Sequence, residues 1–255
     1  MINNNININD QIIDSFIANK ALLIDFDGTL VDYKSNERKA LERLFHKLGI
    51  PTELHSQAKK EYSEINNYYW TQFELKKLSI DEVQLKRFED LCKKFNIVGD
   101  VKEINKYYLE SLVLTTEVPQ EIIETLKDFK KLGLKLIIIT NGVHWTQTER
   151  LKNSGIMNIV DTYFTSESVG YAKPHPKMFL DSKRFLESIN CSTDELWVIG
   201  DNFDADIRGA FDVGFKTCWV SNGNGKKDVN ELFPTLKVNS FLEFAQIYKQ
   251  AKASN

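Results

Sequence analysis

The sequence predicts an α/β protein with a doubly wound (Rossmann-like) parallel sheet and an inserted helical region. Two observations predict this fold. Short apolar runs alternate with amphipathic segments of about ten to fifteen residues, which is the pattern of βαβ units. Between the first two runs the helical pattern continues without a convincing strand. We therefore expect a core domain from residues 1–34 and 116–255 and an α-helical domain from residues 35–115.

Each expected strand is a short run of apolar residues bounded by glycine or polar residues. The first, at residues 21–25, follows a short helix at residues 11–18 and is apolar enough to be buried on both faces. The insertion is expected to hold about four helices, the first starting near Ser35 and ending at Gly49. The later strands are expected at residues 134–139, 163–165, 196–199 and 217–220.

The composition excludes several classes of protein. With 42% hydrophobic and 27% charged residues the chain is globular, and a net charge of −3 argues against a nucleic-acid-binding surface. No stretch approaches the ~18 consecutive apolar residues of a membrane span, and the Asn-rich start lacks the features of a secretory signal. The three cysteines have no metal-ligand spacing, which indicates reduced thiols. We expect a cytoplasmic monomer or weak homodimer that binds neither nucleic acid polymers nor membranes.

Polar side chains follow three of the expected strands. Because the carboxyl ends of parallel strands share one edge of the sheet, where ligands bind, these side chains are expected to converge. Two carboxylates at the end of one strand repel each other unless a cation lies between them, so this arrangement predicts a metal. The residues are Asp25 and Asp27 after the first strand, Thr140 and Asn141 after the second, Asp201, Asp204 and Asp206 after the fourth, and Lys173 in a preceding loop.

This set of side chains suits phosphoryl transfer. Carboxylate oxygens select a hard cation, most plausibly Mg²⁺, and Lys173 with a hydroxyl beside it suits a phosphoryl dianion. An ionised Asp25 needs no base to act as a nucleophile, and it would form an aspartyl-phosphate. Asp27 is placed to protonate the leaving alcohol and then to deprotonate the attacking water. The expected substrate is a small phosphorylated metabolite.

Four motifs resemble those of the haloacid dehalogenase superfamily in order and spacing. They are residues 25–30 (Asp-Phe-Asp-Gly-Thr-Leu), residues 140–142 (Thr-Asn-Gly), Lys173 with Pro174, and residues 200–206 (Gly-Asp-Asn-Phe-Asp-Ala-Asp). The resemblance implies that residues 35–115 are an α-helical cap domain. It implies Asp25 as nucleophile, Asp27 as general acid and base, and Thr140 and Lys173 as phosphoryl binders, to which we add Asn141. It also implies Mg²⁺ held by Asp25, the Asp27 backbone carbonyl and Asp201, with Asp206 mainly supporting these ligands without a direct bond to the ion. Asp204 has no assured role.

Further residues resemble a subgroup of small-molecule phosphatases that includes pyrimidine 5′-nucleotidases and, more distantly, acylneuraminate-9-phosphatases. They are residues 139–143 (Ile-Thr-Asn-Gly-Val), Gln147, Arg150, Leu151, residues 168–170 (Ser-Val-Gly) and residues 217–219 (Thr-Cys-Trp). These residues belong mostly to the scaffold and speak to ancestry more than to substrate. From this resemblance we take a nucleoside 5′-monophosphate as the expected substrate, with a sugar phosphate or acylneuraminate 9-phosphate as alternatives.

Simpler interpretations stand beside each assignment. Thr140 and Asn141 suit a helix cap, Lys173 could be a solvated loop lysine, and Asp206 could bond only loop amides. Aromatic residues at helical spacing are more often core than a base-stacking platform, so we expect core positions for Tyr62, Tyr68, Tyr69, Trp70 and Phe73.

Four other functions share parts of this pattern. A 2-haloacid dehalogenase needs neither a metal nor Asp27, and a phosphosugar mutase would pass the phosphoryl group to a second sugar. A receiver-type signalling domain needs only half this length and no helical insertion. A protein that has lost activity and only binds or regulates would not need the full catalytic set, yet every expected catalytic side chain is present.

Overall fold

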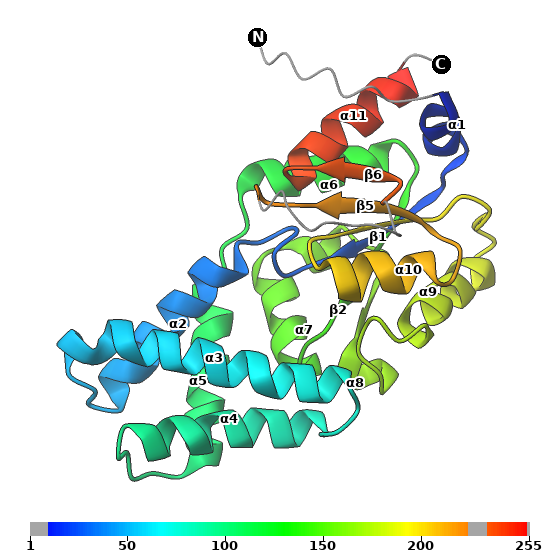
Figure 1. Cartoon of the computed structure of the whole chain (residues 1–255). Helices are drawn as coiled ribbons and strands as arrows, with labels where there is room; N and C mark the ends of the chain where they lie inside the picture. The colour runs from blue at the N-terminus through cyan, green and yellow to red at the C-terminus, as the bar shows by residue number, and fades with distance from the viewer. Residues whose placement is uncertain (1–9, 224–233, 254–255) are drawn as a thin grey trace.

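The computed structural model describes residues 10–223 and 234–253, and the Asn-rich start of the chain lies outside this part. A single six-stranded sheet forms its centre, with every pairing parallel and the order β3-β2-β1-β4-β5-β6 (Figure 1). This is the predicted doubly wound fold class. The strands are β1 (Ala21–Asp25), β2 (Lys135–Thr140), β3 (Thr162–Thr165), β4 (Trp197–Gly200), β5 (Lys216–Val220) and β6 (Leu236–Val238).

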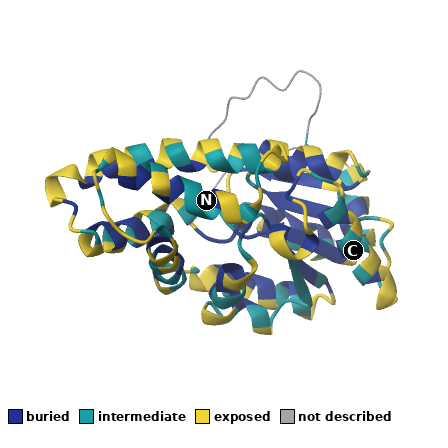
Figure 2. Cartoon of the chain, turned by 90° about the horizontal axis from the view of Figure 1, so that it is seen from below, coloured by how far each residue is buried: buried dark blue, intermediate teal, exposed yellow. Residues whose placement is uncertain are grey.

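Helices cover both faces of the sheet because alternate strand residues point to opposite faces. Leu22 and Ile24 of β1 pack in one apolar cluster with α1, α6 and α11, whereas Leu23 packs in a second cluster with α9 and α10. The strands β1, β2 and β4 are buried almost throughout, whereas the covering helices expose their outer faces (Figure 2). These helices and the shorter ones are α1 (Asp10–Ala18), α6 (Gln120–Lys131), α7 (His144–Asn153), η2 (Ile156–Asn158), α8 (Ser166–Val169), α9 (Lys177–Ser188), η3 (Phe203–Arg208), α10 (Gly209–Phe211) and α11 (Phe241–Ala253).

The helical insertion, residues 33–115, has an apolar core of its own, which includes Leu44, Tyr62 and Phe88. The helices α4 and α5 begin at the polar caps Ser79 and Asp100, whose side chains accept backbone N–H bonds of the first turn. The insertion lies beside the carboxyl edge of the sheet, and α3 extends over it (Figure 1). Its helices are α2 (Tyr33–Lys47), η1 (Thr52–Leu54), α3 (His55–Glu74), α4 (Ile80–Lys94) and α5 (Val101–Thr115).

The expected strands agree with the structure to within one residue at each end, and β1 agrees at both ends. The expectation that the aromatic residues of α3 form core is right for Tyr62 but wrong for Tyr68, which is 59% exposed, and for Trp70, which lines a cavity. Tyr62 shares its buried face with Ala58 and Asn66, and Tyr68 lies on another face of the helix. No helix in the described residues is long and apolar enough to cross a membrane.

Candidate active site

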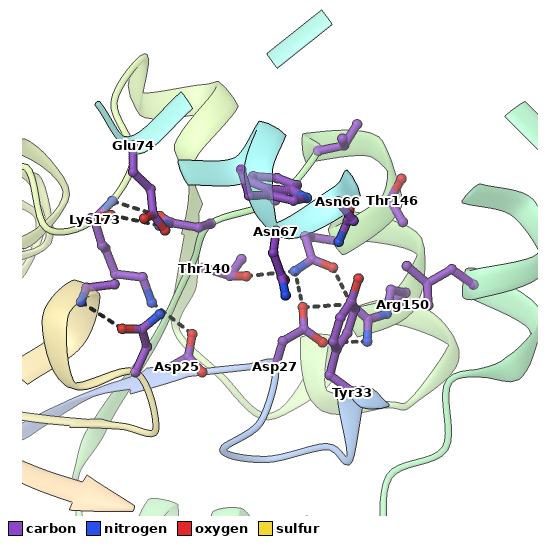
Figure 3. A pocket seen from close by; sticks show the side chains of 18 of the residues that line it. Asp25, Asp27, Tyr33, Asn66, Asn67, Glu74, Thr140, Thr146, Arg150 and Lys173 are labelled. Atoms are coloured by element: carbon purple, nitrogen blue, oxygen red, sulfur yellow. Dashed lines mark hydrogen bonds and ion pairs between the residues drawn. The ribbon is translucent and has the colours of Figure 1, made fainter. Parts of the chain in front are cut away.

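Lys173 joins the ends of two strands at the carboxyl edge of the sheet. Its side chain is 2% exposed, and its ammonium group donates to Asp25 Oδ1 at 2.8 Å and to Asp206 Oδ1 at 2.6 Å. A third bond, to the Ile139 carbonyl oxygen at 2.9 Å, ties it to β2. A buried lysine needs such partners because an unpaired charge is costly to desolvate. Lys173 is therefore a fixed part of the site (Figure 3), in contrast to the solvated loop lysine considered above.

Three carboxylates meet around this lysine. Asp25, Asp201 and Asp206 each offer an oxygen, and these atoms all lie within 4.8 Å of one another. With one ammonium among three carboxylates, the group carries two formal negative charges in excess. Burial raises the pKa of Asp25 well above its usual value, although the charge of Lys173 opposes the rise. The pKa of Asp201 is raised to about 7, first by its burial and then by the negative charge of Asp206. A divalent cation would balance this charge.

The donor set fits Mg²⁺ because it consists of oxygen atoms at the mouth of a parallel sheet, with room for waters or phosphate oxygens. Asp25 and Asp201 are the side chains we expect to hold the ion. Asp206 also accepts the backbone N–H of Asn202 at 3.1 Å, so its two oxygens are already shared between this amide and Lys173. This arrangement suits a supporting role for Asp206.

Two glycines allow these carboxylates to approach the backbone. Gly28 has a φ of +89°, and a Cβ atom placed on it would lie 2.3 Å from Asp201 Oδ2. A Cβ atom on Gly200 would lie 2.3 Å from Asp206 Oδ2. A larger residue at either position would displace a carboxylate of the cluster, so glycine is required by the close approach of side chain to backbone.

Asp27 lies apart from the cluster and is held by two residues of α7. Arg150 donates two bonds to its carboxylate, from Nη1 at 2.8 Å and Nη2 at 2.6 Å, and Gln147 Nε2 donates a third at 2.8 Å. Arg150 Nε also donates to Thr116 Oγ1 at 2.7 Å, where α5 returns to the core. Asp27 is thus linked through Arg150 to the connection between the helical insertion and the sheet (Figure 3).

The two residues at the end of β2 have different roles. Thr140 is 1% exposed and its hydroxyl accepts a bond from Gln147 Nε2 at 2.7 Å, while still lining the cavity. The Asn141 side chain bonds the backbone of Lys173 twice, at 2.8 Å and 2.7 Å. The side-chain amide of Asn141 therefore positions the loop that carries Lys173. Only the backbone of Asn141 is left for a direct contact with phosphate.

A cavity of about 430 Å³ connects all these residues to the helical insertion. Asp25, Asp27 and Lys173 form part of its floor, and α3 lies above them. Asn67 and Glu74 extend from α3 toward the floor in Figure 3. Further along, the cavity is lined by residues of α2, α4, α5 and α7, which include Tyr33, Arg87, Tyr108, Leu112 and Thr146. A substrate whose phosphate contacts Lys173 would therefore place its remainder between the sheet and the insertion.

Residues 22–220 match the family model of the haloacid dehalogenase-like hydrolases. The chain belongs to this family. The match includes all but the first residue of β1, the strands β2 to β5 and the whole helical insertion. The resemblance seen in the four motifs is confirmed.

Individual relatives of this hydrolase extend over nearly the whole chain. It is 32% identical over 228 residues to YfnB of Bacillus subtilis, which is named as a HAD-hydrolase. This alignment covers 89% of this chain and 94% of YfnB. It is 26% identical over 227 residues to the pyrimidine 5′-nucleotidase YjjG of Escherichia coli (89% and 96%). It is 29% identical over 239 residues to the glyceraldehyde 3-phosphate phosphatase of Methanocaldococcus jannaschii (91% and 98%).

Among solved structures, a magnesium-bound crystal structure of YfnB superposes with a TM-score of 0.78 and 31% identity, covering 90% of this chain and 98% of that one. The hydrolase thus shares its fold, including the helical insertion, with a protein crystallised with magnesium.

Three contacts of the site were not assigned from sequence. Thr29 donates its hydroxyl to Asp25 Oδ2 at 2.9 Å, and it stands two residues beyond Asp27 in the first motif. Gln147 and Arg150 resemble scaffold residues of the subgroup, yet both hold Asp27 directly. Their spacing of three residues on one helix places them on a common face, which is the only signal that could have paired them.

Proposed function

We propose that this chain is a Mg²⁺-dependent phosphatase that hydrolyses a nucleoside 5′-monophosphate through an aspartyl-phosphate at Asp25. Membership of the hydrolase family and relatives named as phosphatases and nucleotidases support a phosphoric monoester hydrolase. The observation that carries the mechanism is the contact of Asp25 with the Lys173 ammonium, beside two further carboxylates and at the floor of the cavity.

In the first step an Asp25 carboxylate oxygen attacks phosphorus, and the bond from phosphorus to the substrate oxygen breaks. Lys173 and the Thr140 hydroxyl hold the phosphoryl oxygens, which reduces their repulsion of the nucleophile. Asp25, the Asp27 carbonyl and Asp201 would hold a Mg²⁺ ion, which would supply positive charge against the carboxylates and the phosphoryl group. The Thr29 hydroxyl holds the other oxygen of Asp25 and so orients the attacking one.

Asp27 moves the proton in both steps. It gives a proton to the departing alcohol oxygen, and it then takes one from the water that attacks phosphorus and frees Asp25. In the structure both oxygens of Asp27 accept bonds from Arg150, so reaching the leaving oxygen requires the side chain to turn away from this partner. Because Arg150 also contacts Thr116, movement of the helical insertion is a means of releasing Asp27.

We assign residues 35–115 as a cap domain whose closure excludes water from the first transfer. Lys76, just after α3, lies 4.7 Å from the ring centre of Tyr171 on the core side, so the insertion already contacts the core near the site.

A 2-haloacid dehalogenase would have no use for an Asp27 held in this way, and a mutase would need a second phosphorylated sugar in the same cavity.

A sugar phosphate is the second candidate, because a relative that covers 91% of this chain is named glyceraldehyde 3-phosphate phosphatase. The cavity of about 430 Å³ has room for more than a triose, which favours the nucleotide. Release of phosphate from uridine 5′-monophosphate, glyceraldehyde 3-phosphate and para-nitrophenyl phosphate should be compared with and without Mg²⁺. We expect all turnover to require Mg²⁺ and Asp25, and the nucleotide to have the highest kcat/KM. Turnover that survives both EDTA and Asp25→Asn would refute the mechanism, whereas poor nucleotide turnover alone would refute only the substrate.

A further inference from the structure

The end of strand β5 contacts both loops that carry expected metal ligands. One loop follows β4 and carries Asp201, and the other follows β1 and carries Asp27. Residues 217–219 of β5 resemble scaffold of the phosphatase subgroup, so the sequence predicts no role for them in the site. Two side chains near this end, those of Trp219 and Asn222, nevertheless donate hydrogen bonds to the two loops.

Trp219 holds the backbone of the loop that carries Asp201. The strands β4 and β5 pair as far as Gly200 and Trp219, and one residue further along the indole Nε1 donates to the Asp201 carbonyl oxygen at 2.9 Å. Trp219 is 6% exposed. Its ring centre lies 5.3 Å from that of Phe203, which meets it edge-on, and 4.7 Å from Lys237 Nζ. Because these neighbours fix the ring, the indole N–H has a fixed direction and restrains the backbone of Asp201.

Asn222 holds the loop that carries Asp27. Its Nδ2 atom donates at 2.8 Å to the carbonyl oxygen of Gly28, the residue directly after Asp27. The backbone of Asn222 has a φ of +49°, a left-handed conformation that asparagine adopts more readily than most residues with a side chain. Asparagine therefore suits both the turn at this position and the bond to Gly28.

These two bonds complete a closed set of contacts beside the expected metal position. The Asp201 carboxylate lies against Gly28, because a Cβ atom on that glycine would be 2.3 Å from Asp201 Oδ2. Gly28 is bonded to Asn222 and Asp201 to Trp219, and only two residues separate Asn222 from Trp219. The charge of Asp27 acts against that of Asp201, so the two loops repel each other. The bonds from β5 oppose their separation.

We propose that the end of β5 is a clamp that fixes the spacing of the metal ligands, with Trp219 and Asn222 as its positioning residues. Trp219 acts through the backbone of Asp201, and Asn222 acts through Gly28 on the neighbouring Asp27 carbonyl. Neither side chain would touch the ion or the substrate. Because Mg²⁺ demands near-ideal octahedral geometry, a small change in ligand spacing weakens its binding. This inference rests on the proposed function, because it concerns the ligands of the ion that the reaction needs.

Binding of Mg²⁺ alone tests the clamp without requiring turnover. Mg²⁺ should be titrated calorimetrically into the metal-free, full-length protein and into its Trp219→Phe and Asn222→Gly variants. Each variant removes one bond to a loop, while phenylalanine retains an aromatic ring and glycine tolerates the left-handed backbone. We expect each variant to raise the dissociation constant for Mg²⁺ by about three- to tenfold, which corresponds to the loss of one hydrogen bond.

Two matched controls lie at the opposite edge of the sheet. Trp197→Phe removes an indole N–H that donates to Ser15 Oγ at 2.9 Å, at the start of β4. Asn190→Gly changes an asparagine with a similar φ of +56°, between α9 and β4. Both should leave the Mg²⁺ dissociation constant within about twofold of that of the unaltered protein, because distant sites act independently. The melting temperature of each metal-free variant should also be measured, since a purely structural role would lower it and leave Mg²⁺ affinity unchanged.

Turnover of para-nitrophenyl phosphate, measured in the same preparations with Mg²⁺, separates this inference from the proposed function. If the ester is hydrolysed but either clamp variant binds Mg²⁺ as tightly as its control does, the clamp is refuted and the phosphatase stands. If Mg²⁺ binding weakens as expected but no ester is hydrolysed, the clamp stands and the proposed function is refuted. If the unaltered protein binds no Mg²⁺, both are refuted. Asn222 is exposed, so Asn222→Gly decides the outcome if Trp219→Phe does not fold.

Discussion

Replacing Gly28 by alanine should weaken the metal site more than it weakens the fold. A Cβ atom at this position would lie 2.3 Å from Asp201 Oδ2, about 1 Å closer than an ordinary contact, so the carboxylate must move by about that distance. A displacement of about 1 Å at a reacting centre can cost about 100-fold in rate. The positive φ of +89° adds about 1–2 kcal/mol of backbone strain for any residue with a Cβ atom.

Gly133→Ala is the matched control for this strain. Its φ of +80° is similar, but an added Cβ atom would have nothing within 4 Å. Both variants should lose about 1–2 kcal/mol of unfolding free energy in urea titrations. In assays of para-nitrophenyl phosphate against Mg²⁺ concentration, only Gly28→Ala should raise the half-saturating Mg²⁺ concentration, by about tenfold or more, and lower kcat by about 100-fold. Equal kinetic effects in the two variants, or unchanged Mg²⁺ dependence in Gly28→Ala, would refute the placement of Asp201 beside the ion.

Three further perturbations test other parts of the site. Lys173→Met should lower kcat/KM by about 100-fold or more, because its ammonium contacts the nucleophile and the phosphoryl group; a loss below about threefold would remove it from catalysis. The folded-state pKa of Asp201 is raised to about 7, so the metal-free protein should lose stability as pH rises from the usual carboxyl range to about 7. Mg²⁺ should therefore raise the melting temperature more at pH 8 than at pH 5. A larger increase at pH 5 would contradict the charge balance at the site. Arg150→Met should cost about 3 kcal/mol of stability, because it leaves Asp27 unpaired. It should also slow the hydrolysis of alkyl phosphates more than that of para-nitrophenyl phosphate, whose leaving group needs no proton. Equal slowing of both reactions would limit Arg150 to a structural role.

The strands and the acidic cluster were predictable because both follow from local patterns. An apolar run that ends in Asp25 has few alternatives to a buried parallel strand, and strand ends of one sheet must share an edge. That geometry brought Asp201 and Lys173 to Asp25 although they are about 150 residues or more away in sequence. The order of the four motifs then indicated the family.

The partners of Asp27 could not be read from the sequence in the same way. Gln147 and Arg150 lie on a helix, and only the way α7 packs against α5 and the sheet edge turns both side chains toward Asp27. An arginine on a helix is usually solvated, and burial to 1% exposure depends on this tertiary packing. The same reason applies to Arg87, whose burial depends on how α4 packs against α3 and α5.

Helical spacing alone does not predict which aromatic residues of α3 lie in the core and which line the cavity. Tyr62 and Trp70 are eight residues apart and lie near one another around the helix, yet one is core and the other lines the cavity. The difference arises because α3 is longer than the insertion core that it covers, so its last turns extend over the sheet edge. No local pattern encodes where that core ends. The strand β6 and the helix α11 lie beyond the last strand expected from the sequence.

The covalent intermediate is the central claim, and chemical trapping tests it directly. The enzyme should be mixed with Mg²⁺ and a phosphate ester, quenched in acid within one turnover and reduced with borohydride, which converts an aspartyl-phosphate to homoserine. Mass spectrometry of the peptide that contains residues 21–30 should then show homoserine at position 25 only when substrate was present. Phosphate release at full rate with Asp25 unmodified, or with the label on Asp27 or Asp201 instead, would contradict the account.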